Sequence, residues 1–211
     1  MCCHRRSLVL GTIRDLQIVS NLSSPSRILV LTTKVRRAPS DPVPVLETAR
    51  LRLRGHRAGD HAALLAIWSD PTVVRYIGGR PSTPQEAWLR LLRYPGLWCV
   101  LGYGYWAIEE KSSGRCIGDI GYADFKREIT PSLDGMPELG WVLATESHGK
   151  GYASEALAAV MSWGRAHLGE HTAVCIIDPD NAASIRVASK AGFTLREQTT
   201  YMGDAVLLFT C

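Results

Sequence analysis

PELGWVLATESHGKGYASEAL, residues 137–157, is the stretch of sequence that decides the fold. It predicts a strand over Glu138–Leu143, then a loop with Gly149 and Gly151, then a helix over about 153–168. Glycines let the main chain approach a ligand and turn successive N–H groups into one concavity, and the helix N-terminus adds the positive end of its dipole. The segment therefore predicts a pyrophosphate cradle. The alternative is a helix-opening turn in which glycine serves the backbone geometry alone.

Two common phosphate-binding motifs do not fit this loop. The Walker A pattern, GxxxxGK followed by Ser or Thr, is absent from the sequence. Ser154 stands where the dinucleotide fingerprint GxGxxG has its third glycine. The loop is therefore neither a Walker A loop nor a dinucleotide fingerprint.

Apolar periods and turn signals on both sides of this segment predict further elements. Strands are expected over 46–54, 103–109, 115–125 and 172–178, and near 193–197 and 206–209. Helices are expected from Asp60 to before Pro71, from a capping box at 83–86 up to Pro95, and over 182–191. Together these elements predict an α+β (mixed α/β) fold.

The composition is that of a globular chain that can bury one sizeable core, with 211 residues, 46% hydrophobic and 21% charged. The longest apolar runs, 62–68 and 156–161, fall short of the roughly 18 residues that a spanning helix needs, so we expect no membrane partner. The six cysteines lack the CxxC and Cys/His spacings of a zinc site. We therefore expect no metal, reduced thiols and a cytoplasmic protein.

The basic excess is concentrated at the start of the chain. Residues 1–40 carry seven Arg or Lys against one acid, Asp15, whereas the rest carries 17 basic and 19 acidic residues. Residues 1–44 show no sustained apolar period and end in a Pro-rich stretch, so we expect a basic, disordered leader or linker before a single domain over 45–211. A transit peptide, a basic arm and an upstream extension of the gene model are the three explanations of this leader. Since the folded body is nearly neutral, nucleic acid is disfavoured as a partner.

A second motif follows the strand expected over 172–178. It is NAASIRVASKAGF, residues 181–193. Together with ELGWVL and GKGYASEAL it resembles the GNAT acetyltransferase family, in particular the branch that acetylates the N-termini of ribosomal proteins. The leading ETARLRLR, residues 47–54, and CIGDIGY, residues 116–122, are similar to the same branch. The resemblance covers about residues 45–210.

The resemblance implies a GNAT-like central sheet, mixed but mostly antiparallel, flanked by helices and splayed between the fourth and fifth strands, with acetyl-CoA in the splay. It implies that main-chain groups of Val142 and Leu143 pair with the pantetheine arm, and that Asn181 contacts this arm from the far side. Around the pyrophosphate it implies His148, Gly149, Lys150, Gly151, Tyr152, Ala153 and Ser154. Glu146 departs from the Gln or Arg that family members often carry there.

Two side chains are candidates for proton transfer in the reaction that the resemblance implies. Glu138, at the start of its strand and on the same face as Gly140 and Val142 by alternation, is the candidate base; the alternative is a solvent-exposed strand-end carboxylate. Ser184 is the candidate acid for the leaving thiolate; the alternative is a hydrogen bond within the first turn of a helix.

The expected function is an acetyl-CoA-dependent N-acetyltransferase that transfers the acetyl group directly to a primary amine. The acceptor is a protein N-terminus or a small molecule, and a homodimer is possible. A non-catalytic acyl-CoA-binding module and an antibiotic- or polyamine-detoxifying acetyltransferase are the alternatives.

Overall fold

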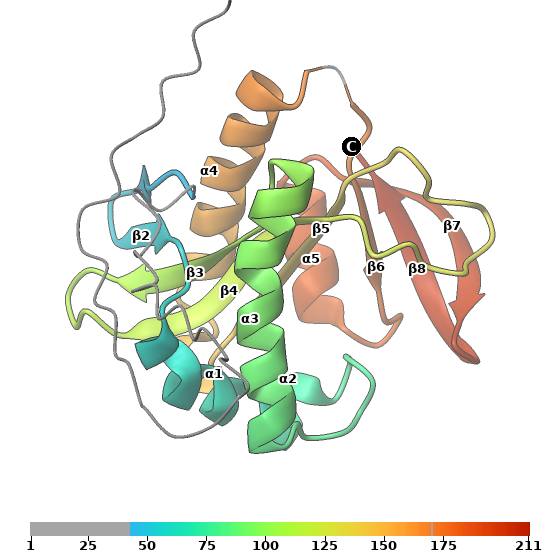
Figure 1. The fold of residues 1–211 in the computed structure, drawn as a ribbon. Helices are drawn as coiled ribbons and strands as arrows, with labels where there is room; N and C mark the ends of the chain where they lie inside the picture. Colours follow the sequence, from blue (N-terminus) through green and yellow to red (C-terminus); the bar gives the residue numbers. More distant parts are fainter. Residues whose placement is uncertain (1–42, 170) are drawn as a thin grey trace, which may run out of the picture. The chain divides into compact units, whose positions relative to one another are not determined.

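The computed structural model describes residues 43–169 and 171–211 (Figure 1). The expected leader, 1–44, lies almost entirely outside the described residues. The described part of the chain begins at Val43, close to the predicted start of the domain.

An eight-stranded sheet organises this part of the chain, in the order β1-β2-β3-β4-β5-β6-β8-β7. The strands are β1 (Leu46–Glu47), β2 (Leu51–Arg54), β3 (Tyr105–Glu110), β4 (Cys116–Ala123), β5 (Glu138–Leu143), β6 (Val174–Ile177), β7 (Thr194–Tyr201) and β8 (Asp204–Thr210). All neighbouring pairs are antiparallel except β5 and β6, which are parallel. The expected mixed, mostly antiparallel sheet is confirmed.

The parallel pair in the middle of the sheet touches at one point. Glu138 and Val174 are its register pair, and the Val174 amide donates to the Pro137 carbonyl at 3.0 Å. β5 continues from there to Leu143 and β6 to Ile177 without a further register pair. The predicted splay between these two strands is confirmed.

Helices cover both faces of the sheet. α1 (His61–Trp68), α2 (Pro71–Val74) and α3 (Pro84–Leu101) lie on one face, and α4 (Tyr152–His167) and α5 (Ala182–Lys190) on the other; α3 crosses in front of the sheet in Figure 1. Short 3-10 turns precede α1 and α4, at Ala58–Asp60 and Thr145–Ser147.

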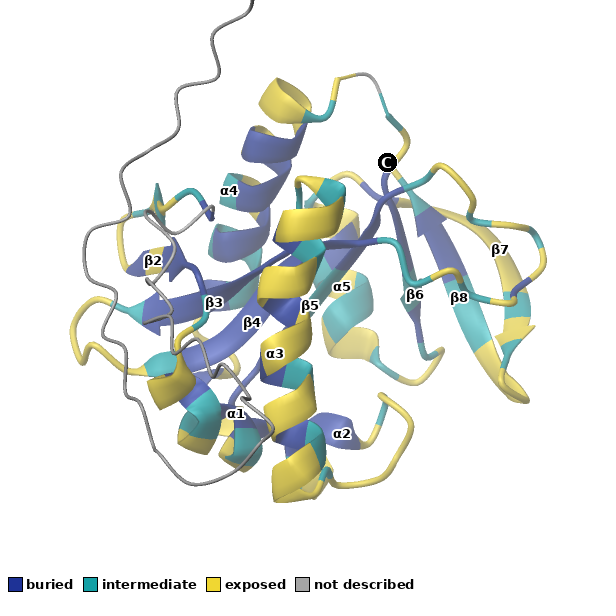
Figure 2. Cartoon of the chain, viewed as in Figure 1, coloured by how far each residue is buried: buried dark blue, intermediate teal, exposed yellow. Residues whose placement is uncertain are grey.

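Strand alternation explains this two-sided core. On β5, Val142 packs with the α1 and α3 side chains, whereas Leu139 and Leu143 pack with those of α4. Three tryptophan rings pack together in the core on the α4 side of the sheet. The ring centroids of Trp98 and Trp106 lie 4.6 Å apart, and those of Trp106 and Trp163 lie 5.2 Å apart. Figure 2 shows the strands under the helices as buried and most of β7 as exposed.

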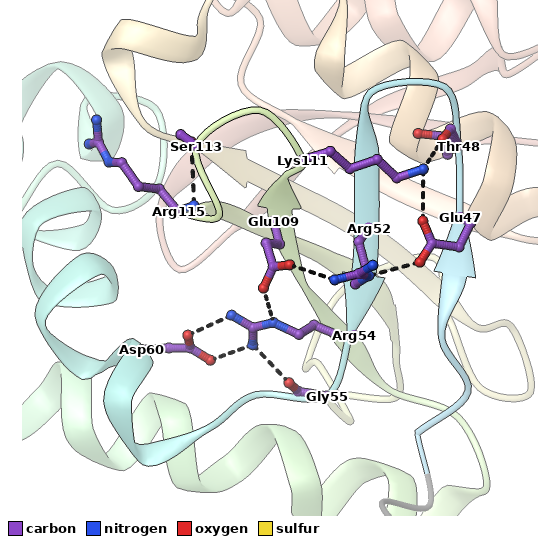
Figure 3. A network of polar contacts seen from close by, with 10 residues as sticks. All are labelled: Glu47, Thr48, Arg52, Arg54, Gly55, Asp60, Glu109, Lys111, Ser113 and Arg115. Atoms are coloured by element: carbon purple, nitrogen blue, oxygen red, sulfur yellow. Dashed lines mark hydrogen bonds and ion pairs between the residues drawn. The ribbon is translucent and has the colours of Figure 1, made fainter.

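The strand predicted over 46–54 is wrong in one respect, because the chain turns back in its middle. Thr48 makes that turn: its N–H donates to the Leu51 carbonyl and its Oγ1 accepts from the Leu51 N–H, both at 2.9 Å. The result is the antiparallel pair β1–β2. Arg54 at its end is buried rather than solvated, because Asp60 and Glu109 bind its guanidinium (Figure 3).

The helix predicted to stop at Pro95 continues to Leu101. Proline removes one helical hydrogen bond, yet the turn after Pro95 is retained because it carries Trp98 into the core. Trp98 also donates its indole N–H to the Tyr105 carbonyl at 3.1 Å. The remaining expected elements are confirmed within a few residues of their predicted ends, and α2 is an addition that the sequence did not indicate.

Candidate active site

The candidate site is the opening between β5 and β6. The two strands are parallel, so their carboxyl ends lie on the same side, and α4 begins after the end of β5 and α5 after the end of β6. The N-termini of both helices therefore border the open end of the splay. Ligands commonly bind at such a position in sheets with parallel strands.

Two main-chain hydrogen bonds show which residues of β5 face β4 and which face the splay. The Pro137 carbonyl points to β6, and the Ala144 N–H points to the Ile117 carbonyl on the β4 side at 2.9 Å. Because main-chain groups alternate along a strand, the groups of Trp141 and Leu143 face the splay, whereas those of Val142 face β4. This alternation favours Trp141 and Leu143 for contacts with an added strand and disfavours Val142, which we expected there.

The loop before α4 has the backbone that the sequence indicated. Gly149 and Gly151 have φ angles of +73° and +78°, a region that glycine adopts without strain. A Cβ at Gly149 would have no heavy atom within 4 Å, so the loop is open on that side. Gly151 is the N-cap of α4 and supplies no side-chain acceptor, which leaves the N–H groups of Tyr152, Ala153 and Ser154 for a ligand.

The side chains around this loop point to different partners. His148 Nε2 lies 3.0 Å from the Leu143 carbonyl, so this ring ties the loop to the end of β5. Lys150 is exposed and its ammonium lies 6.0 Å from the Tyr152 ring centroid. Glu146 is exposed and paired with Arg115 at 3.0 Å, which offsets its negative charge.

The side chain of Tyr152, the first residue of α4, is hydrogen-bonded to the end of β3. Its hydroxyl donates to Glu110 Oε1 at 2.6 Å, and this hydrogen bond raises the pKa of Tyr152. The bond anchors the first residue of α4 to the end of β3. It therefore contributes to the placement of the N–H groups on the first turn of α4.

Asn181 and Ser184 lie together at the start of α5. Asn181 Oδ1 accepts the Ser184 N–H at 3.0 Å, so Asn181 caps the helix in the usual way. Both side chains are half-buried. The structure thus brings the expected acid candidate to the α5 border of the splay, with its main chain engaged in the cap.

Glu138 lies at the other end of the site, where β5 and β6 meet. It is buried, and both carboxylate oxygens accept from Arg127, at 2.6 and 2.7 Å. The Arg127 guanidinium also lies over the rings of Phe125 and Tyr201, at 4.8 and 4.7 Å. The candidate base is therefore a buried, ion-paired carboxylate.

Several residues that sequence reasoning missed belong to this site. The Tyr105 hydroxyl lies directly over Gly140, where any side chain at position 140 would collide with it. The glycine at position 140, inside a predicted strand, is the sequence feature that could have indicated this close contact. Arg127 and Arg50 are the other missed residues. Arg127 reaches the site from the loop before β5, 11 residues from Glu138, and Arg50 from the β1–β2 turn, 100 residues from Lys150.

Two polar side chains of β4, Asp119 and Tyr122, are core residues. Asp119 is fully buried under α1, where its Oδ2 accepts the Trp68 indole N–H at 3.1 Å, and burial raises its pKa to about 6. Tyr122 faces α4, with its hydroxyl against Gly164. Neither side chain lies at the splay.

A hollow of about 370 Å³ lies elsewhere, beside α1 and the β3–β4 turn. Its lining includes Asp60, Ile67, Arg115 and Thr145 but none of residues 148–154. Among the described residues, no group of three or more His, Cys, Asp or Glu could hold a metal ion. No helix of the described chain is long and apolar enough to cross a membrane.

Comparisons with known proteins agree with this geometry. The family described as acetyltransferase (GNAT) domain matches residues 50–194. An uncharacterized N-acetyltransferase of Bacillus subtilis, YoaA, is 30% identical over 151 residues, which span 71% of this chain and 82% of that protein. The crystal structure of an acetyltransferase from Agrobacterium tumefaciens C58 is similar with a TM-score of 0.69 and 29% identity, covering 83% of this chain and 98% of the other.

A further solved structure is similar in fold. It is RimL, a ribosomal L7/L12 α-N-protein acetyltransferase in complex with coenzyme A. The TM-score is 0.64 at 19% identity, and the match covers 80% of this chain and 97% of RimL.

Proposed function

This chain belongs to the GNAT acetyltransferase family, and on that premise we propose that it transfers an acetyl group from acetyl-CoA directly to a primary amine. The acceptor that we propose is a protein N-terminus or a small-molecule amine. The observation that carries the proposal is the splay itself. A free strand edge on β5 and an open glycine loop at the start of α4 border the same gap.

The residues present fit acetyl-CoA. The main-chain groups of Trp141 and the N–H of Leu143 face the splay and can extend the sheet with the amide groups of the pantetheine arm, whereas the Leu143 carbonyl lies 3.0 Å from His148 Nε2. The N–H groups of residues 149–154 and the N-terminus of α4 suit a pyrophosphate. Bound acetyl-CoA supplies the thioester, and the splay orients the amine toward it, which is a large part of the rate advantage in such a reaction.

Proton transfer is assigned to Glu138 and Ser184. Glu138 shares a face of β5 with Gly140 and the Tyr105 hydroxyl, so it lies on the α1–α3 side of the splay. Because Arg127 occupies both of its oxygens, Glu138 accepts a proton only when this pair opens or when a water molecule relays the proton. Ser184, on the α5 side, is the proposed donor to the leaving thiolate.

Binding of acetyl-CoA by calorimetry is the first test of the proposal. Gly151→Asp adds a side chain and a negative charge to the cradle and should weaken binding at least tenfold. Gly114→Asp is the matched control, since Gly114 also has a positive φ of +68° but lies in the β3–β4 turn. Equal affinities of the Gly151→Asp variant and the unchanged chain would refute the site.

Release of coenzyme A with a panel of amines identifies the acceptor class. The panel should contain peptides with free N-termini, polyamines and aminoglycosides, all at the same concentration. A preference for peptides supports a protein N-terminus as the acceptor. If none of the amines in the panel causes release of coenzyme A, the proposed reaction is contradicted.

The pH dependence of turnover tests the role of Glu138. If Glu138 removes the amine proton, Glu138→Gln lowers kcat at neutral pH, and the loss shrinks as the pH rises and free amine accumulates. Acetyl-CoA affinity should stay within about twofold of the unchanged chain, measured by calorimetry. A loss that is independent of pH would instead assign Glu138 and Arg127 to the structure of the site.

A further inference from the structure

The turn between β1 and β2 reaches across to the first turn of α4. Thr48 Oγ1 donates to Glu155 Oε1 at 2.6 Å, and the Arg50 N–H donates to the same oxygen at 2.9 Å. The Arg50 guanidinium binds the other oxygen, with Nε and Nη2 both 2.7 Å from Glu155 Oε2. Four donors from one turn thus occupy one carboxylate.

The same guanidinium also touches the glycine loop. Arg50 Nη1 donates to the Lys150 carbonyl at 2.9 Å. Nη2 lies 3.6 Å from the position that a Cβ on Gly151 would take. The guanidinium carbon lies 4.5 Å from the centroid of the Tyr152 ring. Through its side chain Arg50 therefore contacts Lys150 and Tyr152, the residues on either side of Gly151.

Glu155 would disturb an anion site if it were unpaired, because its carboxylate lies in the first turn of α4. The paired side chain is 18% exposed. Burial alone would raise its pKa, but the hydrogen bonds from Thr48 and Arg50 outweigh burial and lower the pKa of Glu155. The acid therefore stays ionised and its charge is offset by Arg50.

We propose that Arg50 and Thr48 are positioning residues that hold the loop before α4, through Glu155 and the Lys150 carbonyl, in the conformation that binds the pyrophosphate. This inference rests on the proposed function. Two glycines with positive φ give the loop high conformational freedom in the absence of a restraint. The contacts of Arg50 order it before acetyl-CoA arrives, so binding does not have to supply that ordering free energy.

The test compares Arg50→Ala with Arg52→Ala. Arg52 is a matched control, because it lies two residues further along, is 47% exposed against 48% for Arg50, and is also ion-paired, to Glu47 and Glu109 (Figure 3). Its partners belong to β1 and β3 and not to the loop. Arg50→Ala should weaken acetyl-CoA affinity about tenfold, while kcat at saturating acetyl-CoA stays within about twofold; Arg52→Ala should change neither.

Two further variants separate the charge of Arg50 from its geometry. Arg50→Lys keeps the charge but loses the planar fork, so it should recover part of the affinity lost in Arg50→Ala. Glu155→Gln placed on Arg50→Ala removes the unpaired acid and should also recover part of that affinity. No recovery in either variant would contradict the electrostatic part of the proposal.

Amide hydrogen exchange of the ligand-free chain provides a measurement that does not depend on acetyl-CoA. Exchange over residues 149–154 should be faster in Arg50→Ala and unchanged in Arg52→Ala. If Arg50→Ala leaves both this exchange and the acetyl-CoA affinity unchanged, the inference is wrong. Failure of the proposed function would look different, since the unchanged chain itself would then bind no acetyl-CoA.

Discussion

At the scale of single residues, burial under α1 and α3 shifts the pKa values of two ionisable groups in the direction that favours their neutral forms. The His56 ring stacks on Tyr94 at 4.3 Å between centroids, and burial lowers its pKa to about 4. Asp119 is fully buried, and burial raises its pKa to about 6. The two groups therefore act on stability in opposite directions as the pH falls.

The sign of each effect follows from proton binding. Between pH 6.5 and 4 the unfolded chain binds a proton at His56 and the folded chain does not, so acidification costs about 3 kcal/mol of stability. Between pH 6 and 4 the folded chain binds a proton at Asp119 first, so acidification adds about 3 kcal/mol. The two contributions nearly cancel in the unchanged chain.

Single replacements should expose this cancellation. His56→Phe keeps the stacked ring and Asp119→Asn keeps an acceptor for Trp68. Relative to the unchanged chain, His56→Phe should gain stability between pH 6.5 and 4.5 and Asp119→Asn should lose it, measured by urea unfolding. Each variant serves as the control for the other. Parallel pH curves for both would show that neither group titrates abnormally.

At the scale of elements, a glycine sets how closely α4 approaches the sheet. A Cβ at Gly164 would collide with the Tyr122 hydroxyl on β4, whereas a Cβ at Gly96, inside α3, would have no heavy atom within 4 Å. Gly164→Ala should therefore lower the free energy of unfolding by about 1–3 kcal/mol, through overpacking. Gly96→Ala should raise it by about 0.5–1 kcal/mol, through helix propensity.

Thermal and urea unfolding of the two variants check this prediction. Both substitutions add one methyl group to a helical glycine, so helix propensity is common to them. Opposite signs of the change assign the difference to the contact with Tyr122. A stabilising effect of Gly164→Ala would mean that α4 can move away from β4 without cost.

Most elements could be predicted from local patterns, and the exceptions have physical causes. The strands around β5 and the helix α4 follow from alternation and helical spacing in the sequence. The end of α3 could not be predicted, because burial of Trp98 in the tertiary structure outweighs the helix-breaking effect of Pro95. The turn inside 46–54 depends on Thr48, whose partners include Glu155, 107 residues away.

Some parts of the candidate site could likewise be predicted from local sequence, and others could not. The glycine loop could be predicted because its positive φ angles favour glycine, and the sequence has glycine at both positions, Gly149 and Gly151. The contacts of Arg50 join the β1–β2 turn to a helix about 100 residues away, and the pair between Arg127 and Glu138 depends on the fold of the loop before β5, so no local period indicates either of them. The free edge of Trp141 depends on a register that the strand pattern alone does not fix.

At the scale of the whole molecule, the described fold depends on the residues that precede β1. Val43 is buried in the main core, and the Pro44 carbonyl accepts the Trp106 indole N–H at 2.7 Å. A chain that begins at Asp41 should therefore melt at nearly the same temperature as the full chain and turn over acetyl-CoA equally well. Residues 1–40 carry the basic excess and are expected to be dispensable for both properties.

A second truncation provides the control. A chain that begins at Glu47 loses Val43 and Pro44 together with Leu46, the first residue of β1, and burial of one valine alone is worth about 1.5–3 kcal/mol. Its melting temperature should fall by about 5 °C or more in a scanning calorimeter. If the chain from Asp41 melts as low as the chain from Glu47, residues 1–40 contribute to the folded state.

The single register pair between β5 and β6 also makes this junction the weakest point in the hydrogen-bond ladder of the described sheet. Hydrogen-bond ladders join β1 through β5 on one side and β6, β8 and β7 on the other, with Glu138 and Val174 as the pair between them. The C-terminal ladder can therefore open at a lower free energy than the whole chain. A molecule bound along the free edge of β5 and against α5 would bridge this seam, so that its arrival would raise the free energy of that opening.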